Sequence, residues 1–312
     1  MKTQTQVKAL KKKKFNKQTF RENAELWLLA LPGFIHTFIF CYLPMMGIII
    51  AFKKFNPNLG IFDSKWVGFD NFKFFFESND FVRIMRNTVA YGVGFLFLDN
   101  FFPIFLSIML YNVFNRAALK YYQTTMILPN FLSMVLVAFI VYALLNPVSG
   151  VVNRMFGTET DWYAKAGYWP FILSVVHVWK GVGMKSIIYY AALMGIDESL
   201  FEAARIDGAT KWHEIRYIII PELMSLVCIY LILGVGSLVG GDFGLFYQVP
   251  MNVGNLYETT DIINTYVFRA LQQGSNMGRT AAVGLFQSVT GMILVVGSNL
   301  IVKKIDPEKS FF

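Results

Sequence analysis

The segment from Glu202 to Pro221, EAARIDGATKWHEIRYIIIP, is a compact and partly charged stretch between two long apolar runs. Ala203 and Ala204 follow Leu200 by three and four positions, which places both alanines on one face of a short helix. Small side chains on such a face let another surface approach the backbone closely. These residues therefore predict non-covalent contact through a small folded projection, rather than the making or breaking of a bond.

The same segment carries signals for where two short helices begin and end. Ser199-Leu-Phe-Glu202 has the pattern of a capping box, which starts a helix. Gly208 stands where that helix would end in a left-handed residue, and Thr210 can cap a second one. The second helix has one apolar stripe and a proline expected to break it before the next apolar run: Trp212, Ile215, Ile219 and Pro221. We expect a rigid helix–turn–helix rather than a flexible tether.

Three charged residues, Asp99, Lys180 and Lys185, lie inside apolar runs. Charge inside a membrane is costly and needs a reason. Asp99 and Lys180 lie at similar depths, and two hypotheses stand side by side. Either they pair with each other, or they face a water-filled pathway, to which the neighbouring Trp179 would then also contribute.

A polar and aromatic stretch, Gly241 to Arg269, follows the fifth apolar run. Aromatic faces beside amide and carboxylate groups are what binding a sugar requires, because a sugar has apolar ring faces and hydroxyl edges. The candidates for the mouth of a translocation pathway are Asp242, Phe243, Tyr247, Gln248 and Asn252. The aromatic residues fit equally well in a belt at the membrane–water interface.

Enzymatic chemistry has no motif in this chain. No G-x-x-x-x-G-K-[ST] sequence is present, so any ATP must be bound and hydrolysed by another chain. The histidines and cysteines are scattered and are interpreted as packing or interfacial residues: His36, His177, His213, Cys41 and Cys228. We expect no catalytic residue, no metal site and no cofactor bound by this chain.

Composition indicates the class of protein. The chain has 312 residues, 55% of them hydrophobic, and a mean hydropathy of +0.47, which is too apolar for an ordinary soluble domain. A membrane-spanning helix needs about 20 mainly apolar residues. The stretches that qualify are 26–52, 87–110, 121–145, 168–194, 223–241 and 281–302. The sequence predicts an all-α polytopic membrane protein with six transmembrane helices.

The distribution of charge predicts the topology. A basic cluster directly precedes the first apolar run and indicates a cytoplasmic N-terminus. Its members are Lys11, Lys12, Lys13, Lys14, Lys17 and Arg21. Six spans then place the C-terminus in the cytoplasm, beside Lys303 and Lys304. We therefore expect a cytoplasmic segment 1–25, one transmembrane domain 26–302 and a cytoplasmic tail 303–312. The net charge of +8 is explained in this way without nucleic acid.

The loop of about 198–221, between spans four and five, resembles the "EAA loop" of permease subunits of binding-protein-dependent ABC importers. Asp207-Gly208-Ala209 matches the D-G-A of that family. The other matching positions are Glu202, Ala203, Ala204, Gly208, Ile218 and Pro221. The resemblance implies that the loop acts as a coupling helix that docks on a cytoplasmic ATPase. The residues expected to couple are Glu202, Ala203, Ala204, Asp207, Gly208, Ala209, Trp212, Ile215 and Pro221.

Further matches extend the resemblance over nearly the whole chain, from Pro32-Gly33 in the first span to the sixth span. A pattern that precedes the second helix of sugar-type permeases is found at Gly68, Asn71, Phe72, Asn87 and Thr88. VWKGVG, around Trp179 and Lys180, resembles a pattern of their fourth helix. The group that the chain most resembles is the oligosaccharide or polysaccharide permeases of Gram-positive bacteria. Trp212-His213 departs from many members, which affects the fit to a particular ATPase.

The resemblance implies an importer that takes up an oligosaccharide by alternating access across the plasma membrane. Its partners would be a second, similar permease, two ATP-binding subunits that hold ATP and Mg, and an extracellular solute-binding lipoprotein. The alternative from another class is an ion-coupled secondary transporter that uses Asp99 and the lysines. That alternative predicts inverted repeats with paired helix breaks, and neither is evident in the sequence. A membrane receptor or scaffold would leave the loop unexplained.

Overall fold

The computed structural model describes residues 24–274 and 276–306, and the chain divides into two compact units, residues 1–49 and 50–312. The predicted cytoplasmic cluster of lysines in segment 1–25 lies outside the described residues. Residues 307–312 of the predicted tail do as well. Each unit is therefore considered by itself.

The first unit is one apolar helical segment. It consists of the α-helix α2 (Ala24–Thr37), a π-helical turn η1 (Phe38–Tyr42) and most of the 3₁₀ segment η2 (Leu43–Phe52). Leu26–Phe52 is long and apolar enough to cross a membrane. Nearly all of the described side chains of this unit are exposed, which suits a helix whose apolar residues face lipid.

The second unit holds the remaining helices and one small hairpin. The elements before the loop are β1 (Lys53–Asn56), α3 (Gly60–Asp63), β2 (Ser64–Trp66), α4 (Asp70–Phe76), α5 (Phe81–Tyr111), α6 (Arg116–Ile127), η3 (Leu128–Phe131), α7 (Met134–Leu145), α8 (Val151–Phe156), η4 (Ala166–Tyr168) and α9 (Trp169–Leu193). The elements from the loop onward are α10 (Glu198–Ile206), α11 (Lys211–Glu214), η5 (Ile215–Ile219), α12 (Ile220–Gly236), α13 (Phe243–Gln248), η6 (Gly254–Leu256), α14 (Tyr257–Thr260), α15 (Ile263–Gln272) and α16 (Met277–Ile305).

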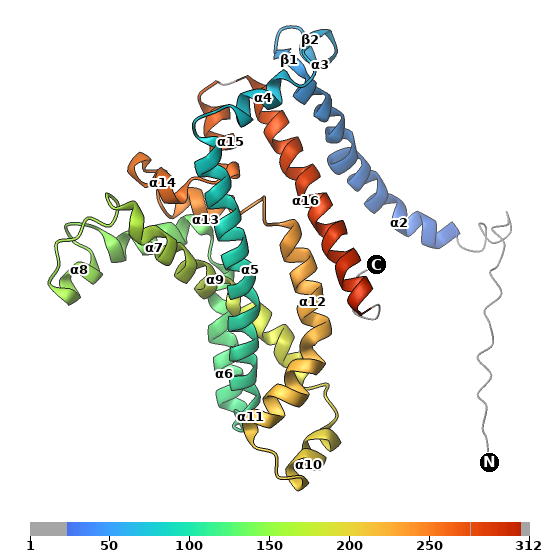
Figure 1. Cartoon of the computed structure of the whole chain (residues 1–312), viewed down its shortest axis with the longest axis vertical. Helices are drawn as coiled ribbons and strands as arrows, with labels where there is room; N and C mark the ends of the chain where they lie inside the picture. Colours follow the sequence, from blue (N-terminus) through green and yellow to red (C-terminus); the bar gives the residue numbers. More distant parts are fainter. Residues whose placement is uncertain (1–23, 275, 307–312) are drawn as a thin grey trace. The chain divides into compact units, whose positions relative to one another are not determined.

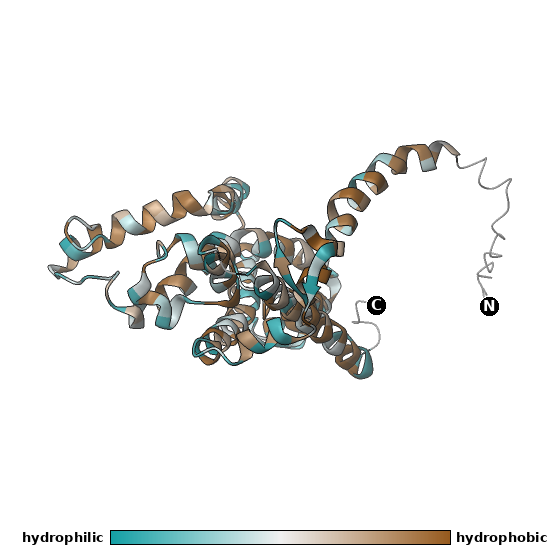
Figure 2. Cartoon of the chain, turned by 90° about the horizontal axis from the view of Figure 1, so that it is seen from above, coloured by the Kyte–Doolittle hydropathy of each residue, from teal (hydrophilic) through white to brown (hydrophobic). Residues whose placement is uncertain are grey.

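The predicted membrane spans are confirmed as helices in five cases. Within the described residues, the long apolar helices are Leu26–Phe52, Phe81–Tyr111, Ala166–Leu193, Lys211–Gly236 and Met277–Ile305. A sixth span exists if the bent pair Arg116–Phe131 and Met134–Leu145 counts as one. Figure 2 shows that these helices are largely hydrophobic, while the connections between them are more polar. The prediction of an all-α membrane protein is therefore confirmed, and the two-stranded hairpin β1–β2 is a minor exception.

The third predicted span is not one straight helix. It bends by 100° between Phe131 and Met134, and in Figure 1 α7 leaves the line of α6. Pro129, in η3, has no N–H to donate within a helix. Ser133 then starts α7 anew, because its Oγ accepts a hydrogen bond from the N–H of Leu136 (3.3 Å). Residues 121–145 were interpreted as one span from their average apolar character, although Pro129, Asn130 and Ser133 were local signals of a break.

Four long helices form the centre of the second unit. α5 packs along α9 and α12, and α12 packs along α16. In Figure 1, α10 and α11 lie at one end of this bundle, and α4, α15 and the β1–β2 hairpin lie at the other. The helices therefore connect two chemically different ends, one with the charged loop and one with the polar and aromatic segment.

Gly183 of α9 allows the closest helix–helix approach in this region. A Cβ atom at this buried position would lie 1.8 Å from the carbonyl oxygen of Met126 in α6. No side chain can be accommodated there unless the two helices move apart. Gly181 lies two residues earlier in the same helix and has open space around its Cα.

Gly183→Ala should therefore lower the free energy of unfolding by about 1–3 kcal/mol, the range typical of overpacking. Gly181→Ala is the matched control and should be neutral or stabilising, because alanine favours a helix more than glycine does. The measurement is the thermal unfolding of each purified variant in detergent. Equal stability of the two variants would contradict the close contact between α6 and α9.

Candidate functional site

The charged loop folds into two short helices joined by a left-handed glycine, as predicted. Gly208 has a φ of +81°, and its N–H donates to the carbonyl of Arg205 (3.1 Å). Thr210 begins α11, since its Oγ1 accepts from the N–H of His213 while its own N–H donates to His213 Nδ1. Both local predictions are confirmed.

The start of the first short helix differs from the prediction. Asp197, not Ser199, is the N-terminal cap of α10, and its carboxylate accepts a hydrogen bond from the N–H of Ser199 (3.0 Å). This hydrogen bond holds the pKa of the exposed Asp197 carboxyl below its usual value. Ser199 lies inside the first turn because an aspartate two residues earlier is also a strong cap.

The predicted break at Pro221 is also wrong. Lys211–Gly236 is continuous as α11, η5 and α12, and Pro221 lies in the first turn of α12. The N–H of Ile220 donates to the carbonyl of Ile215, five residues back, so the hydrogen-bond register slips just before the proline. This π-turn accommodates a residue that has no N–H, and the helix continues.

A buried carboxylate ties the two short helices together. Glu214 of α11 is 5% exposed and accepts a hydrogen bond from Arg205 Nε of α10 (2.9 Å) and from Lys211 Nζ (2.8 Å). The hydrogen bond to Glu214 also raises the pKa of the Arg205 guanidinium. Sequence reasoning missed this pair, although the lysine–glutamate spacing of three was a signal for it. The tie makes the projection rigid.

The projection has one buried side and one exposed side. Phe201 of α10 is 2% exposed and packs in a cluster with Tyr189, Leu193, Ile219 and Leu223 at the ends of α9 and α12. The predicted coupling residues lie on or near the surface, with three partly covered. Exposed are Glu202, Ala203, Asp207, Gly208, Trp212 and Pro221, and partly covered are Ala204, Ala209 and Ile215.

The exposed side of the projection is more apolar than its charged sequence suggests. Ile206 is 86% exposed and Trp212 is 62% exposed. Along the predicted stripe, Ile219 is buried, Ile215 is partly covered and Trp212 is exposed. Exposed large apolar side chains beside small alanines are typical of a surface that contacts a partner.

A cavity of about 410 Å³ lies between α5, α9 and α12. Asp99 lines it together with His177 and Lys185 of α9. Lys185 Nζ lies 2.7 Å from Asp99 Oδ2, and His177 Nε2 lies 3.0 Å from Asp99 Oδ1. His177 also stacks on the ring of Phe95, with 3.8 Å between ring centroids. An intramembrane carboxylate is thus stabilised beside a cavity by two groups of one helix.

Asp99 does not pair with Lys180, so that hypothesis is wrong. Lys180 and Lys185 are five residues apart, which separates them by about 140° around the helix. Lys180 Nζ instead donates to the carbonyls of Asn130 (3.1 Å) and Leu132 (2.7 Å), at the bend of the third span. Neither Lys180 nor the exposed Trp179 lines the 410 Å³ cavity.

The candidates that follow the fifth span divide between two cavities. Asp242 caps α13, since its Oδ1 accepts from the N–H of Leu245, and it lines the 410 Å³ cavity. Tyr247, Gln248 and Asn252 line a separate cavity of about 310 Å³, which α7 borders. Phe243 stacks on Tyr247 with 5.0 Å between ring centroids. Of the predicted pathway residues, the structure therefore brings Asp99 and Asp242 to the 410 Å³ cavity, and Tyr247, Gln248 and Asn252 to the other.

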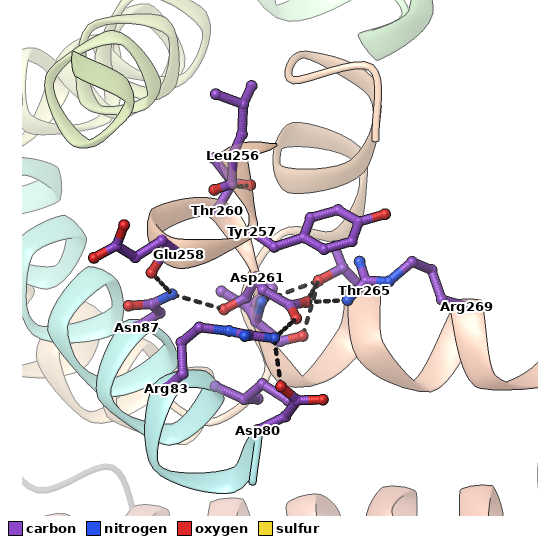
Figure 3. A network of polar contacts seen from close by, with 12 residues as sticks. Asp80, Arg83, Asn87, Leu256, Tyr257, Glu258, Thr260, Asp261, Thr265 and Arg269 are labelled. Atoms are coloured by element: carbon purple, nitrogen blue, oxygen red, sulfur yellow. Dashed lines mark hydrogen bonds and ion pairs between the residues drawn. The ribbon is translucent and has the colours of Figure 1, made fainter. Parts of the chain in front are cut away.

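A buried ion network at the opposite end from the loop was not predicted (Figure 3). Asp261 has a fully buried side chain and pairs with Arg83 of α5 and Arg269 of α15. Thr265 Oγ1 donates to its Oδ1 (2.8 Å), and Asn87 Nδ2 donates to its carbonyl (3.1 Å). The network joins the start of α5 to the segment α14–α15.

Asp261→Ala should lower the free energy of unfolding by about 3–5 kcal/mol, because it leaves two arginines at least partly buried without their counter-ion. Asp70→Asn is the control, since the Asp70–Lys73 pair is exposed and its loss should cost less than about 1 kcal/mol. Thermal unfolding in detergent distinguishes the two variants. An Asp261→Ala protein as stable as Asp70→Asn would show that the network is dispensable.

A bundle of apolar helices with a cavity between them and a folded projection at one end is typical of a multi-pass membrane transport protein. Residues 100–309 match the family described as the binding-protein-dependent transport system inner membrane component. The chain belongs to this family of ABC importer permeases. It is accordingly a multi-pass protein of the plasma membrane, and the ATPase of such a system is a separate subunit.

Two relatives come from Bacillus subtilis (strain 168). The chain is 35% identical to Protein LplB over 92% of this chain and 91% of that protein. It is 34% identical to the polygalacturonan/rhamnogalacturonan transport system permease protein YteP, over 91% of this chain and 89% of that protein. These similarities do not favour an ion-coupled secondary transporter.

The fold also matches a solved structure, that of a bacterial ABC transporter involved in the import of the acidic polysaccharide alginate. The TM-score is 0.85 and the identity 31%, covering 93% of this chain and 98% of that chain. A second structure of a bacterial alginate ABC transporter, in complex with an alginate pentasaccharide-bound periplasmic protein, matches with a TM-score of 0.84. The comparisons therefore agree with the architecture of a sugar importer.

Proposed function

We propose that this chain is one permease subunit of an ATP-driven importer that takes up an oligosaccharide, a breakdown product of a polysaccharide. The polygalacturonan/rhamnogalacturonan permease and the alginate transporter support a saccharide as the transported solute. Delivery by an extracellular solute-binding protein is supported by the structure of the alginate transporter with its periplasmic protein. Transport would occur by alternating access.

The observation that carries the proposal is the rigid projection α10–α11. Its buried Glu214 ties α10 to α11, and its buried Phe201 packs the projection against the ends of α9 and α12. Its exposed face carries small and apolar side chains beside charged ones. Such a body transmits force to the helices behind it, whereas a flexible loop would not. We propose that this face, centred on Ala203, Gly208 and Trp212, docks on an ATP-binding subunit in the cytoplasm, with both termini on the same side of the membrane.

The link from the projection to the cavity is short. Tyr189 of α9 belongs to the cluster that holds Phe201, and its Oη donates to Asn100 Oδ1 (3.1 Å). Asn100 lines the 410 Å³ cavity beside Asp99. A shift of the projection would therefore reach the cavity through one buried side chain and one hydrogen bond.

The complete assembly would contain a second permease, two ATP-binding subunits with ATP and Mg, and a solute-binding lipoprotein. The first test is purification of this chain from its native membrane in mild detergent, with mass spectrometry of the proteins that co-purify. We expect a second permease and an ATP-binding subunit. An intact chain recovered without any ATP-binding subunit would overturn the proposal.

Gly208 allows a sharper test of docking. Gly208→Val places a β-branched residue in a left-handed conformation, which costs at least about 1–2 kcal/mol. The strain should distort the projection, so that uptake falls severalfold and ATP hydrolysis no longer rises with the loaded solute-binding protein. Gly208→Asn should retain most of the activity, because asparagine tolerates this conformation.

A matched control lies in another part of the second unit. Gly157 also has a positive φ (+63°) and open space around its Cα, but it ends α8 rather than the projection. Gly157→Val should therefore leave stimulation of the ATPase intact. Normal uptake and normal stimulation in Gly208→Val would argue against coupling through α10–α11.

A further inference from the structure

The charges that line the 410 Å³ cavity have an unusual balance for a site that would take an acidic sugar. The lining side chains that can carry a charge near neutral pH are Asp99, His177, Lys185 and Asp242. The lining therefore contains two carboxylates, one ammonium group and one imidazole. The lining charge is negative when His177 is neutral and zero when it is protonated, and in neither state is it positive.

The one ammonium group is already engaged. Lys185 Nζ lies 2.7 Å from Asp99 Oδ2, so its charge is compensated within the protein. Asp242 differs from Asp99, because it forms no ion pair with any of the described residues. Its Oδ1 accepts only the N–H of Leu245, at the start of α13. The uncompensated charge of the cavity is therefore a carboxylate.

The uncharged groups of the cavity suit a neutral polar ligand. Tyr91 Oη is buried and has no hydrogen-bond partner among the described residues, although Tyr91 lines the cavity. A buried hydroxyl without a partner is costly, and a ligand hydroxyl would satisfy it. Phe95 and Phe246 add aromatic surface beside it, which suits the C–H faces of a sugar ring.

We propose that the cavity of this chain selects uncharged saccharides over uronates, with Tyr91 binding a sugar hydroxyl and Asp242 repelling sugar carboxylates. This inference rests on the proposed function as a saccharide importer and adds the charge class of the substrate. It separates the chain from its structural relative, whose substrate alginate is an acidic polysaccharide. Asp242 is exposed at the cavity, and a carboxylate brought beside it meets like-charge repulsion that a neutral sugar does not.

The sign of the cavity potential can be measured without knowing the sugar. Ser237 is exposed and lines the cavity. The variant Ser237→Cys, made together with Cys41→Ser and Cys228→Ser, therefore gives this chain a single reporter thiol. The rates of its reaction with cationic and anionic methanethiosulfonate reagents are compared in the purified, complete transporter. Each rate is divided by that of a small free thiol.

We expect the cationic reagent to react faster at this position. Asp242→Asn should lower the cationic-to-anionic ratio roughly fivefold to tenfold, the effect of removing one unit charge several ångströms away in a partly wet site. Asp70→Asn removes an exposed carboxylate that does not line the cavity and should leave the ratio unchanged. Preference for the anionic reagent, or no response to Asp242→Asn, would overturn the charge assignment.

An uptake measurement provides the second test. Reconstituted transporter with its solute-binding protein is offered pairs of oligosaccharides of the same linkage that differ only in CH₂OH or carboxylate at each ring. Uptake of the neutral member and not the uronate supports the inference, and uptake of the uronate at an equal or higher rate overturns it. Absence of an ATP-binding subunit from the purified complex would instead count against the proposed function, while the thiol ratio would still report the charge.

Discussion

The constraint on which this structure depends is that polar groups within an apolar surrounding must find their partners inside the protein. In a bilayer, an unpaired backbone carbonyl or side-chain charge costs several kcal/mol. Lys180 illustrates the constraint, because its ammonium group lies where the bend of the third span frees the carbonyls of Asn130 and Leu132. Asp99 illustrates it again with Lys185 and His177. In both cases a side chain of α9 supplies the partner, which makes α9 the helix that orders the others.

The same constraint separates what could be predicted from the sequence from what could not. The long apolar runs were predictable because length and composition alone decide whether a helix can cross a membrane. The caps at Gly208 and Thr210 were predictable as well, since each depends on residues within one or two turns. The start of α10 was nevertheless predicted two residues too late, because Asp197 and not Ser199 is its N-terminal cap.

Non-local partners were beyond these local rules. The pairing of Asp99 with Lys185 depends on how α5 and α9 are rotated against each other, and depth along the membrane does not contain that information. Asp261 reaches Arg83 across 178 positions of sequence, so no spacing rule connects them. The bend after Pro129 is a different case, because Pro129 and Ser133 were local signals that the average hydropathy of the run outweighed. Tertiary packing decided the two ion pairs.

α9 both lines the cavity and contacts the projection, so in the proposed mechanism it is the helix that connects the two. Its His177 and Lys185 hold the charged wall of the cavity, and its Tyr189 and Leu193 pack in the cluster that seats Phe201 of the projection. Gly183, which lies between His177 and Lys185 in the sequence, lets α6 approach α9 closely. A push on the projection would therefore move the cavity wall as one body rather than bend the helix. If the projection couples as proposed, rigid packing at both ends of α9 transmits its movement, and a change at either end should alter the other.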